Sequence, residues 1–166
     1  MRCKRGERNA QFALYHQYSK AMYNICRRML YDHMEAEDVL QNSFVDVFTK
    51  IRSFRGESTI GAWIKRIVIN NCINQIKKKK IKTDAWDDRF ADIPEEEEEN
   101  YRVEDIENVK RAIRELPEGY RAVFSLYAME GYDHQEIGKI LGVSEATSKS
   151  QYSRAKKKIR QIVNAR

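Results

Sequence analysis

The sequence predicts an all-α protein made of two small helical domains joined by a flexible acidic linker. Three observations support this prediction. Only two prolines and seven glycines interrupt the 166 residues, apolar residues recur at helical spacing in both halves, and the sign of the charge reverses in the middle of the chain. Hydrophobic residues make up 42% of the chain and charged residues 34%, so each half can bury a core beneath a polar surface.

Residues 12–30 and 35–51 are predicted to form the first two helices. In both segments apolar residues recur at steps of three and four, which places them along one helix face. The two stripes consist of Leu14, Tyr18, Ala21, Ile25 and Met29, and of Leu40, Phe44, Val47 and Ile51. We expect these two faces to form the core of the first domain.

Residues 59–80 are predicted to form a third helix, which follows a break at "SFRGES". Gly56 interrupts the periodic pattern there, and either Ser58 or Thr59 can cap the next helix. The segment is rich in isoleucine, so a strand is the alternative. A helix is favoured because the later isoleucines keep helical spacing and no alternation of polar and apolar residues continues beside them. These isoleucines are Ile69, Ile73 and Ile76.

The charge reverses within "KKKKIKTDAWDDRFADIPEEEEEN". Residues 1–81 carry 16 basic and 7 acidic side chains, residues 82–104 carry 3 and 10, and residues 105–166 carry 12 and 8. The middle segment lacks a sustained apolar period and contains Pro94. These features predict domains at 1–81 and 105–166 and a flexible linker at 82–104. A charged, solvated helix is the alternative for the glutamate run itself.

Both predicted domains are basic, which favours a polyanionic partner. Binding to phosphates releases condensed counterions, so clustered cations mark surfaces that bind nucleic acid. For any single lysine run, a solvated helix face is the simpler interpretation. Two separate basic domains favour nucleic acid.

The second domain is predicted to begin with a helix that ends at Pro117, followed by a short helix. Each has one apolar stripe. The stripes are Ile106, Val109, Ile113 and Leu116, and then Tyr120, Val123, Phe124 and Tyr127.

The segment "GYDHQEIGKILGVSEATSKSQYSRAKKKIRQIV" is predicted to form a helix-turn-helix. Asp133 and Glu136 have the spacing of a capping box. Gly142 stands where a helix ends in left-handed geometry, and Ser144 is a good cap for the helix that follows. The inner stripe of this last helix is Tyr152, Ala155, Ile159 and Ile162.

The last helix has the composition of a DNA-recognition helix. The major groove admits one α-helix, whose N-terminal half reads base edges, and a basic C-terminal half suits phosphates. Simple packing of an αα-hairpin is the alternative. We expect the following side chains to lie on the exposed side and to contact DNA: Thr147, Lys149, Ser150, Gln151, Ser153, Arg154 and, in the basic cluster, Lys157.

In the first domain, "FRGEST" and "WIKRIVINNCINQIKKKK" combine aromatic rings, amides and cations. Aromatic rings can stack on unpaired bases, and cations beside them can contact the phosphate backbone of a single strand. Trp63 alone is more simply a core residue. Asn70, Asn71 and Asn74 are mediocre helix formers, so their presence in a helix needs a reason. One interpretation is that their amides pair with base edges, and the alternative is that they are tolerated surface residues.

Two segments together resemble a known family. "AEDVLQNSFVDVFTKIRSFRGESTIGAWIKRIVINNCINQIKKKK" resembles the second conserved region of bacterial sigma factors, and "IRELPEGYRAVFSLYAMEGYDHQEIGKILGVSEATSKSQYSRAKKKI" resembles their fourth region. With no other conserved domain between them, the chain resembles the extracytoplasmic-function (ECF) group. The resemblance covers residues 10–81 and 105–163. It implies binding to core RNA polymerase and to promoter DNA, with help in melting the duplex, and often control by an anti-sigma protein.

The resemblance also implies roles for individual residues. Polymerase docking is implied for Asp38, Gln41 and Phe44. Contacts with the unpaired −10 element are implied for Phe54, Arg55, Gly56, Ser58, Arg66, Asn70 and Asn74, and the stacking chemistry of its ring adds Trp63 to this predicted surface. Contacts with the duplex −35 element are implied for Lys149, Ser150, Ser153 and Arg154, and the composition of the helix adds Thr147, Gln151 and Lys157 to this predicted surface.

Two residues of the last helix depart from the family pattern. Ser148 stands where an apolar residue is usual, and we expect it to loosen the packing of the helix-turn-helix. Gln151 stands where arginine is frequent, and its amide is expected to shift the −35 preference towards adenine.

Two other classes of function compete with this interpretation. A stand-alone helix-turn-helix regulator accounts for the second domain, but it predicts dimer-related half-sites and leaves the first domain without a role. An enzyme is disfavoured, because His16, His33 and His134 are isolated and no phosphate-binding loop or nucleophile motif is present. Neither a metal, another cofactor nor a small-molecule substrate is expected.

Cytoplasmic localisation is the last expectation. Cys3, Cys26 and Cys72 are odd in number and widely spaced, which suits reduced thiols. The basic start of the chain is not followed by an apolar segment, and no apolar run reaches the ~20 residues of a membrane span, so we expect neither secretion nor direct membrane insertion.

Overall fold

The computed structural model describes residues 2–80 and 106–165. These ranges are built from helices and turns and contain no strand, which confirms the all-α prediction. The chain divides into two compact units, Met1–Lys79 and Lys80–Arg166. The predicted acidic linker, residues 82–104, lies outside the described residues.

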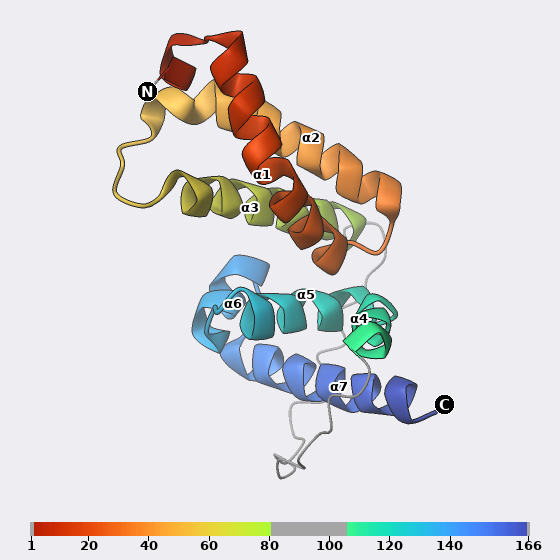
Figure 1. The fold of residues 1–166 in the computed structure, drawn as a ribbon. Helices are drawn as coiled ribbons and strands as arrows, with labels where there is room; N and C mark the ends of the chain where they lie inside the picture. Colours follow the sequence, from red (N-terminus) through yellow and green to blue (C-terminus); the bar gives the residue numbers. More distant parts are fainter. Residues whose placement is uncertain (1, 81–105, 166) are drawn as a thin grey trace. The chain divides into compact units, whose positions relative to one another are not determined.

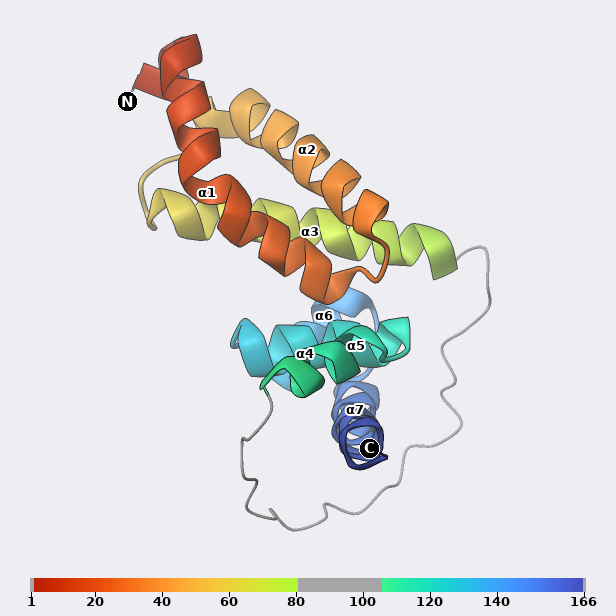
Figure 2. The same cartoon turned by 45° about the vertical axis from the view of Figure 1, so that its right-hand side comes forward.

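The first unit is a set of three long helices with two short 3-10 segments. In both views α1 and α2 run side by side and α1 passes across α3 (Figures 1 and 2). The elements, in order, are η1 (Arg2–Arg5), α1 (Arg8–Met29), α2 (His33–Lys50), η2 (Ile51–Ser53) and α3 (Ile60–Lys80).

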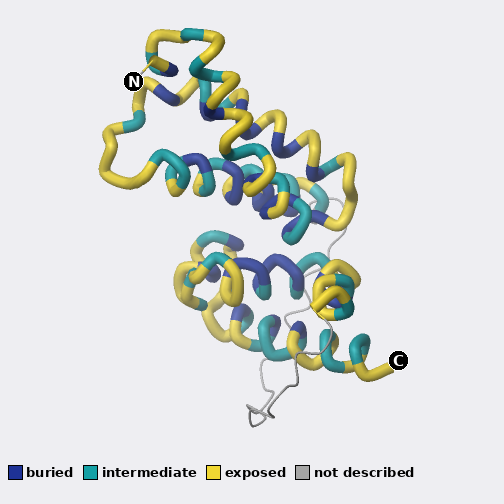
Figure 3. Tube along the Cα trace, viewed as in Figure 1, coloured by how far each residue is buried: buried dark blue, intermediate teal, exposed yellow. Residues whose placement is uncertain are grey.

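The core of the first unit lies where these three helices face one another (Figure 3). The whole predicted stripe of α2 is buried, from Leu40 to Ile51. On α1 the prediction is wrong at Ala21, which is exposed, whereas Met22 and Cys26 are buried. Because α1 packs against α2 and its Cys26 also contacts Cys72 of α3, its buried face is wider than one stripe.

The third helix confirms the choice of helix over strand for the isoleucine-rich segment. Its buried residues keep helical spacing throughout and are Ile64, Val68, Ile69, Cys72, Ile73 and Ile76. Thr59 is the residue that caps it, because its Oγ1 accepts a hydrogen bond from the backbone N–H of Ala62 at 3.2 Å. An ion pair between Lys79 and Glu35 also joins α3 to α2.

In the second unit, α7 packs against α4, α5 and α6. Figure 2 shows α7 nearly end-on. The elements are α4 (Ile106–Arg114), α5 (Glu118–Phe124), a π-helical turn η3 (Ser125–Met129), α6 (His134–Leu141) and α7 (Glu145–Asn164).

The predicted stripe of α4 is only half correct. Ile113 and Leu116 are buried, but Ile106 is 57% exposed and Val109 37% exposed. The buried residues of α4 itself are Ala112 and Ile113, both in its last turn. The first turn therefore contributes little to the core.

Arg121 is a buried cation that the sequence analysis did not single out. Its Nη1 donates to the carbonyl oxygens of Arg114 at 2.9 Å and Leu116 at 3.0 Å. Carbonyl groups at a helix C-terminus lack partners within the helix, so a charged donor there satisfies them and complements the helix dipole. Arg121 therefore joins α5 to the end of α4.

Candidate nucleic-acid interface

The helix-turn-helix forms with the predicted caps. Asp133 and Glu136 make a reciprocal capping box at the start of α6. Gly142 ends α6 with φ 72°, and Ser144 accepts from the N–H of Thr147 at 2.9 Å. A Cβ on Gly138 would lie 2.8 Å from the carbonyl oxygen of Val143, so this position needs glycine for the turn to close.

Most of the polar side chains that were predicted to contact the −35 element reach the surface of α7. Lys149 and Lys157 are exposed, and the others, which are Thr147, Ser150, Ser153 and Arg154, are partly exposed. Exposed polar side chains near the N-terminal half of a helix, followed by cations, are what a groove-reading helix needs.

Gln151 contradicts the predicted placement. It is only 5% exposed and lies with Ser148 and Ala155 on the inner face of α7. The reason is that α7 packs against α4, α5 and α6, so its buried face is shifted from the predicted inner stripe. Of that stripe only Ala155 is buried, whereas Tyr152, Ile159 and Ile162 are partly exposed. The expected contact between Gln151 and adenine loses its basis, because this amide does not lie on the exposed side.

Ser148 also differs from its expectation. Rather than loosening the motif, it is fully buried, and its Oγ lies 2.9 Å from Nδ1 of His134 at the start of α6. The His134 ring stacks on Tyr127, with centroids 4.2 Å apart. Burial, with a smaller effect of Lys149, lowers the pKa of His134, which favours the neutral ring. A hydrogen bond thus joins the two helices of the motif.

In the first unit, the loop between η2 and α3 presents its tip to solvent. Arg55, Gly56 and Ser58 are exposed, and Gly56 has φ 79°, in the left-handed region that favours glycine. Phe54 and Trp63 are partly buried and contact each other, with ring centroids 5.4 Å apart. Trp63 is therefore not a fully buried core residue, and its contact with unpaired bases stays a prediction.

Arg66, Asn70 and Asn74 are all exposed on α3. Their spacing of four residues places them along one face of the helix. This face continues from the exposed loop into the lysine-rich end of α3.

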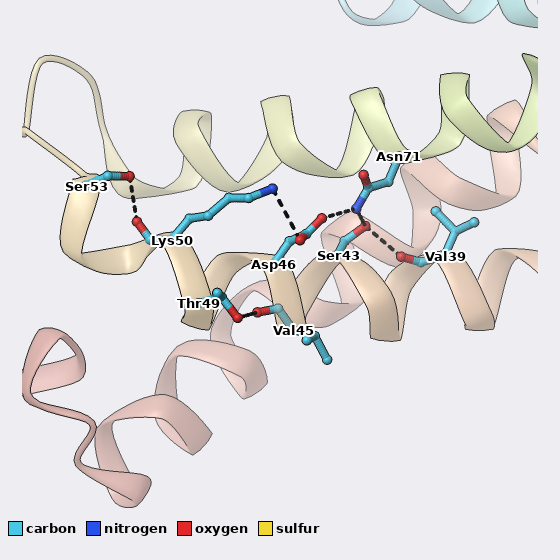
Figure 4. A network of polar contacts seen from close by, with 8 residues as sticks. All are labelled: Val39, Ser43, Val45, Asp46, Thr49, Lys50, Ser53 and Asn71. Atoms are coloured by element: carbon cyan, nitrogen blue, oxygen red, sulfur yellow. Dashed lines mark hydrogen bonds and ion pairs between the residues drawn. The ribbon is translucent and has the colours of Figure 1, made fainter.

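The neighbouring Asn71 has a structural role instead. Its Nδ2 donates to Oγ of Ser43 at 3.1 Å and to Oδ2 of Asp46 at 3.0 Å, and Ser43 in turn donates to the carbonyl oxygen of Val39 (Figure 4). The hydrogen bond from Asn71, followed by that from Lys50, holds the pKa of Asp46 below its usual value. This network ties α3 to α2.

The residues expected to dock on polymerase separate into two groups. Asp38 and Gln41 are exposed on α2. Phe44 is only 3% exposed and packs edge-on against Tyr15 with ring centroids 4.7 Å apart, so its expected place on a docking surface is wrong. Its position in the apolar stripe of α2 already assigns it to the core.

Two exposed apolar residues of α2 were missed by the sequence analysis. Met34 is 74% exposed and Val45 is 64% exposed. With Asp38 and Gln41 they recur at steps of four and three, which places all of them on one face. Their positions outside the apolar stripe of α2 could have identified them.

Within residues 2–80 and 106–165, none of the helices has the length and apolar character of a membrane span.

Both units match models of one family. The sigma-70 region 2 model matches residues 14–81, and the sigma-70 region 4 model matches residues 106–159. The chain is 27% identical over 158 residues to the ECF RNA polymerase sigma factor SigM of Mycobacterium tuberculosis, covering 95% of this chain and 79% of that protein. It is 29% identical over 169 residues to ECF sigma factor SigW of Bacillus subtilis, with 95% and 90% covered.

Solved structures share the fold. The sigma factor RpoE of Bartonella quintana, in complex with the anti-sigma factor NepR, has 22% identity and a TM-score of 0.57, with 92% of this chain and 95% of that chain covered. CnrH, in complex with the cytosolic domain of CnrY, has 19% identity and a TM-score of 0.53, with 99% and 94% covered.

Proposed function

The chain belongs to the extracytoplasmic-function group of bacterial sigma factors, and from this premise we propose which of its surfaces perform each step of promoter-specific initiation. As a sigma factor it binds core RNA polymerase and promoter DNA. The proposed division assigns the −10 element and polymerase docking to the first unit, and the −35 element to the second. RNA synthesis itself belongs to the core enzyme, so the chain contributes binding and positioning and no catalytic group.

The −35 element is assigned to α7. Base edges in the duplex are read by the exposed polar side chains of its N-terminal half, and phosphates by Arg154 and Lys157. Ser148 and His134 hold α7 against α6 from the inside. Gln151 supports this surface through the core and does not read bases.

The −10 element is assigned to the loop at residues 54–58 and to the exposed face of α3. A base that leaves the stack needs a pocket or ring to receive it and cations along its backbone. The loop offers an exposed tip beside the Phe54–Trp63 pair, and Arg66, Asn70 and Asn74 continue from it. This continuous row of exposed polar side chains is the observation that carries the proposal.

Polymerase docking is assigned to the α2 face formed by Met34, Asp38, Gln41 and Val45, with Phe44 supporting it from beneath. Exposed apolar side chains among polar ones are typical of protein interfaces. A cytoplasmic location follows from the proposed partners. An anti-sigma protein is a further proposed partner, since the similar solved sigma factor RpoE is in a complex with the anti-sigma factor NepR.

Transcription of the host's genomic DNA by core polymerase with and without this protein tests the proposal. Mapping of RNA 5′ ends should reveal start sites that appear only with the protein and share two upstream elements at a fixed spacing. Tight binding to specific DNA without core polymerase, and no new start sites with it, would instead support a stand-alone regulator.

A further inference from the structure

The N-terminal segment, residues 2–7, is attached to the unit and lies at the start of the proposed −10 loop. Cys3 is only 6% exposed, and the N–H of Gly6 donates to the carbonyl oxygen of Cys3 at 3.0 Å. Arg2 and Glu7 form an ion pair at 2.7 Å. The segment is therefore folded, and η1 contacts η2.

Lys4 makes the contact that reaches the loop. Its Nζ donates to the carbonyl oxygen of Phe54 at 2.6 Å, in a partly buried site, and lies 6.0 Å from the centroid of the Phe54 ring. A hydrogen bond from an ammonium group to a carbonyl is stronger than a neutral one. The two residues are 50 positions apart, so this bond fixes the loop to a distant part of the chain.

Phe54 is consequently held from three directions. Its N–H donates to the carbonyl oxygen of Ile51 at 3.3 Å, its carbonyl oxygen accepts from Lys4, and its ring contacts Trp63. At the other end of the loop, Thr59 caps α3. Residues 55–58 between these anchors are exposed. The loop thus has an open tip and two fixed ends.

We propose that Lys4 is a positioning residue for the capture of an unpaired base by this loop. The inference rests on the proposed −10 function and adds to it an N-terminal determinant outside the loop and α3. Lys4 fixes the entry of the loop before DNA binds, so less conformational freedom is lost on binding. Its ligand class is an unpaired nucleobase in single-stranded DNA, and Lys4 acts on it through Phe54.

The test uses holoenzyme and a fluorescent single-stranded oligonucleotide that carries the −10 element of a mapped promoter. Lys4→Met removes the donor and keeps the stem, whereas Lys20→Met makes the same change at an exposed lysine of α1. We expect Lys4→Met to raise the Kd about tenfold, which corresponds to ~1.4 kcal/mol of binding free energy. Lys20→Met should leave the Kd unchanged. Lys4→Arg, which retains a charged donor, should restore most of the affinity.

Two readouts separate positioning from a direct phosphate contact. In the free protein, amide hydrogen exchange at residues 52–59 should be faster in Lys4→Met than in the Lys20→Met control. The dependence of affinity on salt should keep its slope, because a lost phosphate contact would lower the slope by about 0.7 for a single strand.

Each alternative outcome has a distinct meaning. Unchanged affinity and unchanged exchange in Lys4→Met would overturn the proposal, as would a reduced salt slope without faster exchange. If wild-type holoenzyme itself does not bind the oligonucleotide above a scrambled sequence, the proposed −10 function fails, whatever the role of Lys4.

Discussion

Asn70 and Asn71 are adjacent on α3 but have different surroundings, so the same substitution at each should separate stability from DNA binding. Asn70 is exposed, whereas Asn71 donates both amide hydrogens across to α2. We predict that Asn71→Ala destabilises the first unit and that Asn70→Ala weakens binding to the −10 single strand without destabilising the unit.

The magnitude follows from the two hydrogen bonds of Asn71. The bond to the Ser43 hydroxyl is worth about 1 kcal/mol and that to the Asp46 carboxylate about 1.5–3 kcal/mol. Solvent screening at this partly exposed site reduces the contribution of the second bond. The better helix propensity of alanine offsets about 0.5 kcal/mol of the lost stability. The expected net loss is about 2 kcal/mol, which for a unit of this size lowers the Tm by roughly 10 °C.

Thermal unfolding followed by Trp63 fluorescence measures this loss. A Trp86→Phe background leaves Trp63 as the only tryptophan, so the signal reports on the first unit. Because both asparagines sit on the same helix, differences in helix propensity cancel between the two variants. Tm values for Asn70→Ala and Asn71→Ala that agree within about 2 °C would refute the assignment of the network to stability.

The pH dependence provides a second check on Asn71. Its hydrogen bond is the largest cause that lowers the pKa of Asp46 from the ordinary value of 3.8. A carboxyl group with a lowered pKa in the folded state contributes stability above its unfolded pKa, and this contribution is lost as the pH falls through the folded value. The difference in Tm between wild type and Asn71→Ala should therefore be full at pH 6 and shrink below about pH 4. A difference that stays constant over that range would contradict this role.

Three further predictions concern the interior of both units. Ser148→Ala should lower the stability of the second unit by about 1 kcal/mol, since it leaves Nδ1 of His134 without this hydrogen bond, and should weaken duplex −35 binding; an unchanged Tm by calorimetry would contradict it. Arg121→Met should cost about 2–3 kcal/mol, because buried carbonyl groups lose a charged donor, and equal urea midpoints for variant and wild type would show that the contact is dispensable. The Sγ atoms of Cys26 and Cys72 are 3.8 Å apart, and both residues are fully buried. Their mutual hydrogen bond and burial raise the pKa of Cys72, so we expect both thiols to react with a thiol reagent only on unfolding. Rapid labelling of both thiols in the folded protein would refute this.

Local features of the fold could be predicted from the sequence because their causes lie within a few residues. The caps of the helix-turn-helix are examples, since Asp133, Glu136, Gly142 and Ser144 act on neighbouring backbone groups. The choice of helix for the isoleucine-rich segment depends on spacing alone, and this too is visible in the sequence.

Features that depend on distant neighbours could not be predicted in the same way. Gln151 is buried because three other helices surround α7, and the periodicity of α7 alone does not reveal how many partners it has. Asn71 has partners 25 and 28 positions away, so nothing near it in sequence separates it from the exposed Asn70. Phe44 shows a conflict that the sequence did contain, because it was assigned both to an apolar stripe and to a docking surface.

We propose that the two units read different promoter elements in different states of the DNA. Equilibrium binding of holoenzyme to two separate probes tests it most directly: a duplex −35 fragment and a single-stranded −10 oligonucleotide from the same mapped promoter. Arg154→Ala in α7 should weaken binding to the duplex alone, and Arg66→Ala in α3 should weaken binding to the single strand alone. If each substitution weakens both probes equally, or if their effects are exchanged, the proposed division between the two units is contradicted.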